Sequence, residues 1–166
     1  LDRSGIVGKD GETHQGIFDL SYLSSMPGIT VLSPMDGEEL KASLDFALQN
    51  METPVAVRYP RGTAYQYPGM HSSYEYGKGE ILCEGREILM LAVGNMAEMA
   101  LRAADRLRES GIVPTIVNMR FVKPFDEQLV ERLAKQHSVV VTLEDNVYSG
   151  GFSERIQAFL QEHGWK

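Results

Sequence analysis

The side chains best suited to chemistry lie in a glycine-rich stretch near the start of the chain, Asp2–Gly16. Glycines let a backbone turn sharply and approach a ligand closely. His14 follows Asp10 by four residues, and a carboxylate close to an imidazole can fix its tautomer and raise its pKa, which suits proton transfer near neutral pH. The glycine spacing matches neither the dinucleotide fingerprint nor the Walker A loop. On composition alone, a catalytic loop and a solvated, turn-rich loop are equally good interpretations.

Two arginines, Arg3 and Arg61, are candidates for binding an anion. Each is expected at the end of a strand, where α/β folds place their ligands. A guanidinium group holds a phosphate in a defined orientation better than a lysine does, because it donates two parallel hydrogen bonds. The simpler alternative for each arginine is a surface salt bridge. Arg58 lies within a predicted strand, so we expect a structural ion pair there.

The composition excludes several classes of function. The net charge of −7 argues against a nucleic-acid partner, which normally meets a basic surface. No apolar run approaches the ~20 residues of a membrane span, and the N-terminus lacks the layout of a signal peptide, so no membrane partner is expected. A single cysteine, Cys83, excludes an internal disulfide and a cysteine-based metal site. It favours a reducing compartment, and we expect a cytoplasmic, bacterial protein.

Apolar periodicity predicts a first βαβ unit in the early part of the chain. It consists of a strand at 29–32, a helix from about 36 to 50 capped by Asp36, and a buried strand at 54–59. The inward face of the helix is expected to carry Leu40, Leu44, Ala47 and Leu48. A strand, a helix and a strand in this order imply a parallel sheet.

A second unit follows an irregular stretch at 63–77 that contains Tyr65, Pro68 and Gly69 and is expected to be a linker. Strands are predicted at 80–82, 88–93, 114–118 and 139–143, and helices at 97–109, 124–136 and 153–162. Met99 and Leu107 are expected to face inward from the first of these helices. The sequence therefore predicts an α/β protein with two parallel-sheet units, 1–62 and 78–166. The first residues look like the end of a strand, so we expect a piece of a larger protein.

Four motifs in order resemble the 1-deoxy-D-xylulose-5-phosphate synthase family of the transketolase superfamily. The first is the opening run Asp2–Leu23, which contains the core Gly-x-Asp-Gly-x-Thr-His ending at His14. The others are Val57–Gly62, Arg120–Pro124, and Val141–Asn146 with Gly150–Phe152. Transketolase itself shares the core, but Gly16–Tyr22 is similar to the synthase family only. The resemblance implies part of a pyrimidine-binding domain followed by a truncated transketolase C-terminal-like domain.

The resemblance also implies an activity for the full-length protein. It would be a thiamine-diphosphate-dependent transferase that condenses pyruvate with glyceraldehyde 3-phosphate to 1-deoxy-D-xylulose 5-phosphate and CO2, in a pathway to isoprenoid, thiamine and pyridoxal precursors. By motif position His14 would contact substrate and assist proton transfer with Asp10 beside it, and Arg3 and Arg61 would bind the acceptor's phosphate. Thiamine diphosphate and Mg²⁺ would be bound mainly by an N-terminal region outside this chain, so no cofactor or metal ligand is assigned here. The full-length protein is expected to be a homodimer.

Three alternatives stay open. One is another thiamine enzyme, transketolase or the β-subunit of a 2-oxo-acid dehydrogenase. Another is a non-catalytic regulatory or assembly module. A natural split-gene subunit lies between the two, although a natural boundary would more often fall in a linker than inside a strand. In each of the enzymatic cases the isolated chain is expected to be inactive.

Overall fold

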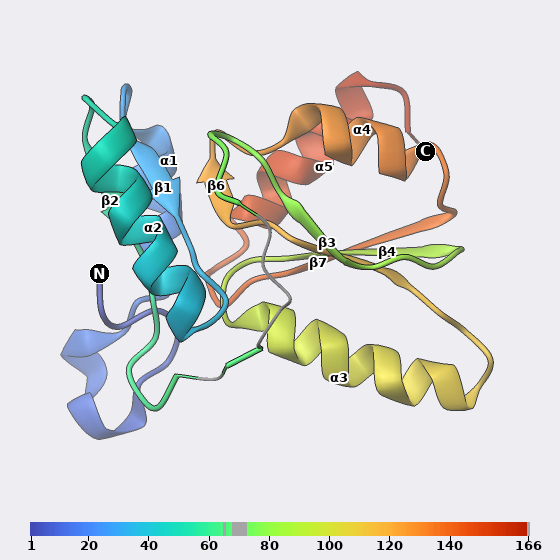
Figure 1. Ribbon diagram of the computed structural model, residues 1–166, viewed down its shortest axis with the longest axis horizontal. Coiled ribbons are helices and arrows are strands. Elements are labelled where there is room, and N and C mark those ends of the chain that lie inside the picture. The colour runs from blue at the N-terminus through green and yellow to red at the C-terminus, as the bar shows by residue number, and fades with distance from the viewer. Residues whose placement is uncertain (65, 68–72, 166) are drawn as a thin grey trace.

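A computed structural model describes residues 1–64, 66–67 and 73–165. Tyr65, Pro68 and Gly69 of the expected linker lie outside the described residues. Helices cover both faces of a four-stranded sheet, and a smaller three-stranded sheet lies beside it with its own helices (Figure 1). The glycine-rich stretch forms an excursion at one end of the molecule (Figure 1). The predicted α/β class is confirmed.

The first βαβ unit is present as predicted. Strand β1 (Thr30–Leu32) pairs in parallel with β2 (Val55–Val57), and helix α2 (Gly37–Asn50) connects them. Asp36 caps α2 by accepting a hydrogen bond from the Glu39 amide at 2.8 Å. Strand β2 is half-buried rather than buried, and the backbone of Leu1 pairs with Val57 and Tyr59 at its end.

The predicted inward face of α2 is partly wrong, although Leu40 and Ala47 are half-buried. The buried side chains are Glu39, Ser43 and Phe46, whereas Leu44 and Leu48 are exposed, Leu48 by 84%. Apolar spacing cannot identify this face, because Glu39 is buried by ion-pair and hydrogen-bond partners from distant segments. The helix therefore turns a partly polar side toward the rest of the chain.

The second unit contains the larger sheet, in the order β3-β5-β4-β7. Its strands are β3 (Glu80–Cys83), β4 (Ile88–Ala92), β5 (Thr115–Asn118) and β7 (Val139–Leu143). Helix α3 (Met96–Glu109) covers one face, and α4 (Glu127–Ala134) and α5 (Phe152–Glu162) cover the other (Figure 1). Leu107 of α3 is partly buried as expected, but Met99 is exposed.

Two strands run against the predicted parallel direction. Strand β3 is antiparallel to β5, and β6 (Phe121–Lys123), which the sequence did not predict, is antiparallel to β1. A parallel connection needs a dozen or more residues, whereas only residues 84–87 separate β3 from β4. The sheets are therefore mixed.

The two units share a sheet and a core. Strand β6 follows 63–77 in the sequence but completes the sheet β2-β1-β6. The largest core cluster likewise joins Leu20, Leu23 and Val31 to strands β4 and β5 and to helices α4 and α5. The division of the chain at 63–77 stays a prediction, and the packing ties both sides of it together.

Buried charged side chains lie where the two sheets meet. Arg120 is 2% exposed, its Nε lies 2.9 Å from Glu39 Oε1, and it forms a second ion pair with Glu80. Asn118 donates to both oxygens of Glu39, and the Arg120 guanidinium stacks 4.7 Å from the centre of the Tyr74 ring. Burial first, and the nearby Glu39 charge second, raise the pKa of Tyr74.

Three short helices were not predicted. Helix α1 (Asp19–Ser25) follows the glycine-rich stretch, and the single turns η1 (Gly8–Asp10) and η2 (Glu12–His14) lie within it. In the part of the chain that the structure describes, no helix has the length and apolar character needed to cross a membrane.

Candidate active site

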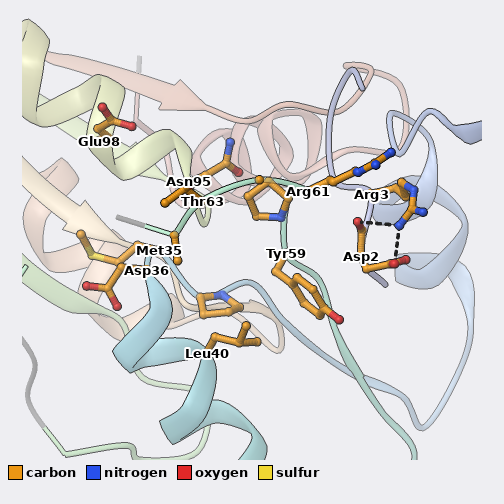
Figure 2. A pocket seen from close by; sticks show the side chains of 14 residues that line it. Asp2, Arg3, Met35, Asp36, Leu40, Tyr59, Arg61, Thr63, Asn95 and Glu98 are labelled. Carbon is orange, nitrogen blue, oxygen red and sulfur yellow. Dashed lines mark hydrogen bonds and ion pairs between the residues drawn. The ribbon is translucent and has the colours of Figure 1, made fainter. Parts of the chain in front are cut away.

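The main candidate site is a cavity of about 760 Å³ at the carboxyl ends of the strands. Its walls come from the segments that follow Leu1, β1, β2 and β4, and Figure 2 shows the side chains that line it. Open α/β sheets bind ligands at this edge, where successive loops leave the strands. The segments that leave β1 and β4 touch there, because Gly94 approaches Ser33 so closely that an added Cβ would lie 2.3 Å from its Oγ.

The two predicted phosphate ligands converge at this cavity. Arg3 Nε lies 2.6 Å from Asp10 Oδ2, as a close ion pair without the geometry of an aligned hydrogen bond. Arg61 Nη1 forms an ion pair with Asp10 Oδ1. Figure 2 shows the Arg61 side chain extending toward Arg3. One carboxylate, 13% exposed, therefore holds two guanidinium groups from segments almost 60 residues apart in the sequence.

A second carboxylate contributes on the solvent side. Arg3 Nη1 also forms an ion pair with Asp2, drawn as dashed lines in Figure 2. A backbone hydrogen bond, and secondly the bond from Arg3, lower the pKa of Asp2. The guanidinium of Arg3 is therefore held by carboxylates on two sides, Asp2 and Asp10.

His14 lies apart from this ion-pair group. It ends the turn η2, it is exposed, and its Nδ1 lies 2.9 Å from the hydroxyl of Thr13. The carboxylate of Asp10, which was expected beside the imidazole, instead lies between the two arginines. The structure thus brings together Arg3, Asp10 and Arg61 of the predicted residues, whereas His14 is not among the residues that line either cavity at this site.

The ends of the glycine-rich stretch are fastened to each other. Gly5 and Gly16 exchange two backbone hydrogen bonds of 2.9 Å, and Ser4 donates one to the Tyr59 carbonyl at 3.1 Å. A Cβ on Gly16 would lie 1.9 Å from the carbonyl oxygen of Arg3, so only glycine fits this crossing. We call residues 5–16 the substrate loop and the Gly5–Gly16 pairing its neck.

Arg58 is the structural ion pair that was expected, and it lies directly behind the neck. Its side chain is fully buried, and Nη2 donates to the Gly16 carbonyl at 2.8 Å. The Nε atom bonds to Asp19 at 2.9 Å and Nη1 to Asp145 at 2.5 Å. The sequence marked Arg58 as buried but could not name these acceptors, because Asp145 lies 87 residues away.

A second cavity of about 510 Å³ adjoins the first, and Arg61 and Asn95 line both. Asn95 precedes α3 and does not cap it through its side chain. Sequence analysis missed it, and its only signal is its place between a strand end and a helix start. Lys9 lies on the wall of this second cavity, so basic side chains border both.

The described residues offer no site for a metal-bound diphosphate. Among residues 1–64, 66–67 and 73–165, no three His, Cys, Asp or Glu side chains are grouped so that they could hold a metal ion. The residues present therefore do not fit the Mg²⁺ that accompanies thiamine diphosphate in the resemblance.

Comparisons with known proteins agree along the chain. Residues 1–66 match the family model for the transketolase pyrimidine binding domain, and residues 77–166 match that for the transketolase C-terminal domain. The 1-deoxy-D-xylulose-5-phosphate synthase of Lachnoclostridium phytofermentans is 46% identical over 100% of this chain and 27% of its own length. That of Syntrophus aciditrophicus is 48% identical over 98% of this chain and 25% of its own length.

A solved structure described as a split gene transketolase, inactive beta4 tetramer, superposes with a TM-score of 0.87. It is 30% identical and covers 99% of this chain and 53% of its own chain. The chain spans about a quarter of the length of the curated relatives it matches. The C-terminal domain model alone matches more than half of the chain, and the fold agrees with it. The chain belongs to the transketolase family.

Proposed function

We propose that this chain forms the acceptor-binding part of a thiamine-diphosphate-dependent transferase. The whole protein would condense pyruvate with glyceraldehyde 3-phosphate, giving 1-deoxy-D-xylulose 5-phosphate and CO2. The proposal rests on relatives that carry the synthase name and are 46% and 48% identical to nearly all of this chain. Within the chain, it concerns the arginine pair at the cavity.

The observation that carries the proposal is the convergence of two guanidinium groups on one anion. Arg3 and Arg61 reach the carboxylate of Asp10 from opposite ends of the first unit. A phosphate monoester offers more negative charge and more acceptor oxygens than a carboxylate, and charge-assisted bonds to two arginines would orient it. When such a phosphate binds between the arginines, Asp10 must share them or release them.

The remaining roles follow from the position of the substrate loop. With the acceptor phosphate at Arg3 and Arg61, the carbon chain of the acceptor would extend toward the loop that carries Asp10 and His14. An imidazole is a side chain that can donate a proton to the acceptor oxygen as a carbon–carbon bond forms. His14 is therefore proposed to assist proton transfer and Asp10 to orient the acceptor.

Thiamine diphosphate supplies the electron sink that lets pyruvate lose CO2 and transfer a two-carbon unit. Its ligands, and those of Mg²⁺, are proposed to lie outside this chain, and no step here depends on a residue of this chain binding them. We also propose a homodimer of the whole protein and a location in the cytoplasm, which the single cysteine favours.

A chimaera tests the proposal. In it, this chain replaces the matching segment of the Lachnoclostridium phytofermentans relative, and the unmodified relative is the control. We expect the chimaera, given thiamine diphosphate, Mg²⁺, glyceraldehyde 3-phosphate and [2-¹³C]pyruvate, to form 1-deoxy-D-xylulose 5-phosphate labelled at C2, with one CO2 per product. A chimaera that folds and dimerises like the control but makes no labelled product would refute the proposal.

Transketolase activity is the second candidate, because the neighbour with a TM-score of 0.87 is described as a transketolase. The same chimaera distinguishes the two when the donor is changed. A ketose phosphate donor should support little turnover under the proposal, and pyruvate should support little if the chain is transketolase-like.

A further inference from the structure

We infer that the Arg58–Asp145 ion pair is a positioning device by which the second unit sets the anion affinity of the arginine pair. Neither residue lines the main cavity, although Asp145 lines the second cavity that adjoins it. Both act through the neck of the substrate loop, because Arg3 lies just before the neck and Asp10 lies within the loop that the neck closes. The part that concerns phosphate rests on the proposed function.

The first step is the hold that Arg58 has on the neck. Its Nη2 donates to the carbonyl of Gly16, and Gly16 is bonded through two backbone hydrogen bonds to Gly5. The carbonyl of Arg3 passes so close to Gly16 that no side chain fits between them. A displacement of the Gly16 backbone would therefore be transmitted to Arg3 directly.

The second step is that Asp145 fixes the direction of Arg58. A guanidinium is a planar, rigid fork, so bonds on one edge determine where the other edge points. Asp19 accepts from Nε and Asp145 Oδ1 accepts from Nη1, while the Asp145 carbonyl lies 3.4 Å from Nη2. With both acidic partners in place, Nη2 is held at the carbonyl of Gly16, 2.8 Å away.

The third step is that Asp145 is itself immobilised by both of its neighbours in sequence. Glu144 accepts hydrogen bonds from the amides of Phe152 and Ser153 and so fastens the segment to the start of α5. Asn146 accepts from the Leu20 amide at 3.2 Å and donates to Ser21 Oγ at 2.9 Å on helix α1. The segment after β7 is thus anchored at both sides of Asp145.

Asp145 also packs against the neck from the other side. A Cβ built on Gly5 would lie 2.7 Å from Asp145 Oδ2, and Gly5 has a φ of +76° that glycine adopts readily. Asp145 therefore contacts one strand of the neck and orients the arginine that holds the other. Through Asp145, the family region at 77–166 thus reaches the loop of the region at 1–66.

Asp145→Asn in the 166-residue chain is the first test, because it removes the charge and keeps the size. We expect the Gly5 and Gly16 amides to exchange hydrogen about tenfold faster, while β4 amides are unchanged. In a titration with inorganic phosphate, followed by NMR signals of the Arg3 and Arg61 side chains, we expect about tenfold weaker binding. Asp105→Asn, which alters an exposed ion pair with Arg108, is the matched control.

Gly5→Ala is the second variant and disturbs the same contact from the loop side. It should accelerate exchange at Gly16 and weaken phosphate binding in the same way, although Arg58 and Asp145 are both retained. Unchanged neck exchange in Asp145→Asn would overturn the inference, as would equal acceleration in β4. Faster neck exchange with unaltered phosphate binding would also overturn it.

These experiments distinguish failure of the positioning role from failure of the proposed phosphate site. A parent chain whose Arg3 and Arg61 signals do not respond to inorganic phosphate would contradict the phosphate site of the proposed function. Hydrogen exchange at Gly5 and Gly16 needs no ligand, so it would still decide whether the ion pair positions the loop.

Discussion

Asp10 decides how Arg3 and Arg61 are arranged. Two guanidinium groups repel each other unless an anion lies between them, and here the carboxylate of Asp10 fills that place. Arg61 is 48% exposed, so water screens much of its attraction to Asp10 and the pair can open at modest cost. A ligand that brings more charge than a carboxylate would compete well for the same two arginines.

Replacing Arg61 in the chimaera separates phosphate binding from carbon chemistry. Arg61→Ala should lower kcat/KM for glyceraldehyde 3-phosphate about 10- to 100-fold, the usual range for losing one hydrogen-bonded charge. The KM for pyruvate should change little, and Arg61→Lys should recover only part of the loss, because a lysine cannot make the paired bonds. Arg102→Ala on the exposed side of α3 is the control. An equal loss with glyceraldehyde, which lacks the phosphate, would exclude the role.

The elements meet at two buried groups of charges. Arg58 joins the neck of the loop to helix α1 and to the segment after β7. Arg120, just before β6, joins helix α2 to strand β3 through Glu39 and Glu80. Both groups lie where segments from the two units pack together, which explains why the inward face of α2 is partly polar.

Removing Arg120 should strongly destabilise the chain. Arg120→Ala leaves Glu39 and Glu80 with less compensation in the interior, and breaking a buried pair costs about 3–5 kcal/mol. The free energy of unfolding in urea measures the loss. Arg102→Ala, which removes an exposed pair 3.9 Å long, should change it by no more than about 0.5 kcal/mol. A loss from Arg120→Ala as small as that of the control would mean that the buried group contributes little.

At the scale of the whole molecule, the proposed site on this chain is only part of what the proposed reaction needs. It carries the arginine pair, but its described residues include no group suited to a metal ion. Apolar side chains are exposed on α2 and along the edge strand β7, where Val139 is 45% exposed. Exposed edge strands readily pair with other chains, so these surfaces are available for association.

The isolated chain should not turn over pyruvate. Purified and supplied with thiamine diphosphate, Mg²⁺ and glyceraldehyde 3-phosphate, it should release CO2 at the rate of a protein-free blank. The chimaera in the same assay is the control, and product formation by the chain alone would contradict the account.

Local patterns in the sequence were enough to predict the α/β class, the positions of most helices and strands, and the ends of some helices. Asp36 caps α2 as predicted, and Gly111 follows α3 with a φ of +78°. These features depend on residues within a few positions of each other, so periodicity and capping preferences reveal them. The motifs likewise indicated the family, and they placed Arg3 and Arg61 at strand ends.

Only the tertiary structure decided which distant residues meet. It placed β6 in the sheet of the first unit and made β3 antiparallel to β5. It also set Asp10 between two arginines rather than beside His14. It also joined Arg58 to Asp145. Each of these contacts links segments whose separation carries no periodic signal, and each buried charge is stable only because its partner arrives from elsewhere in the fold.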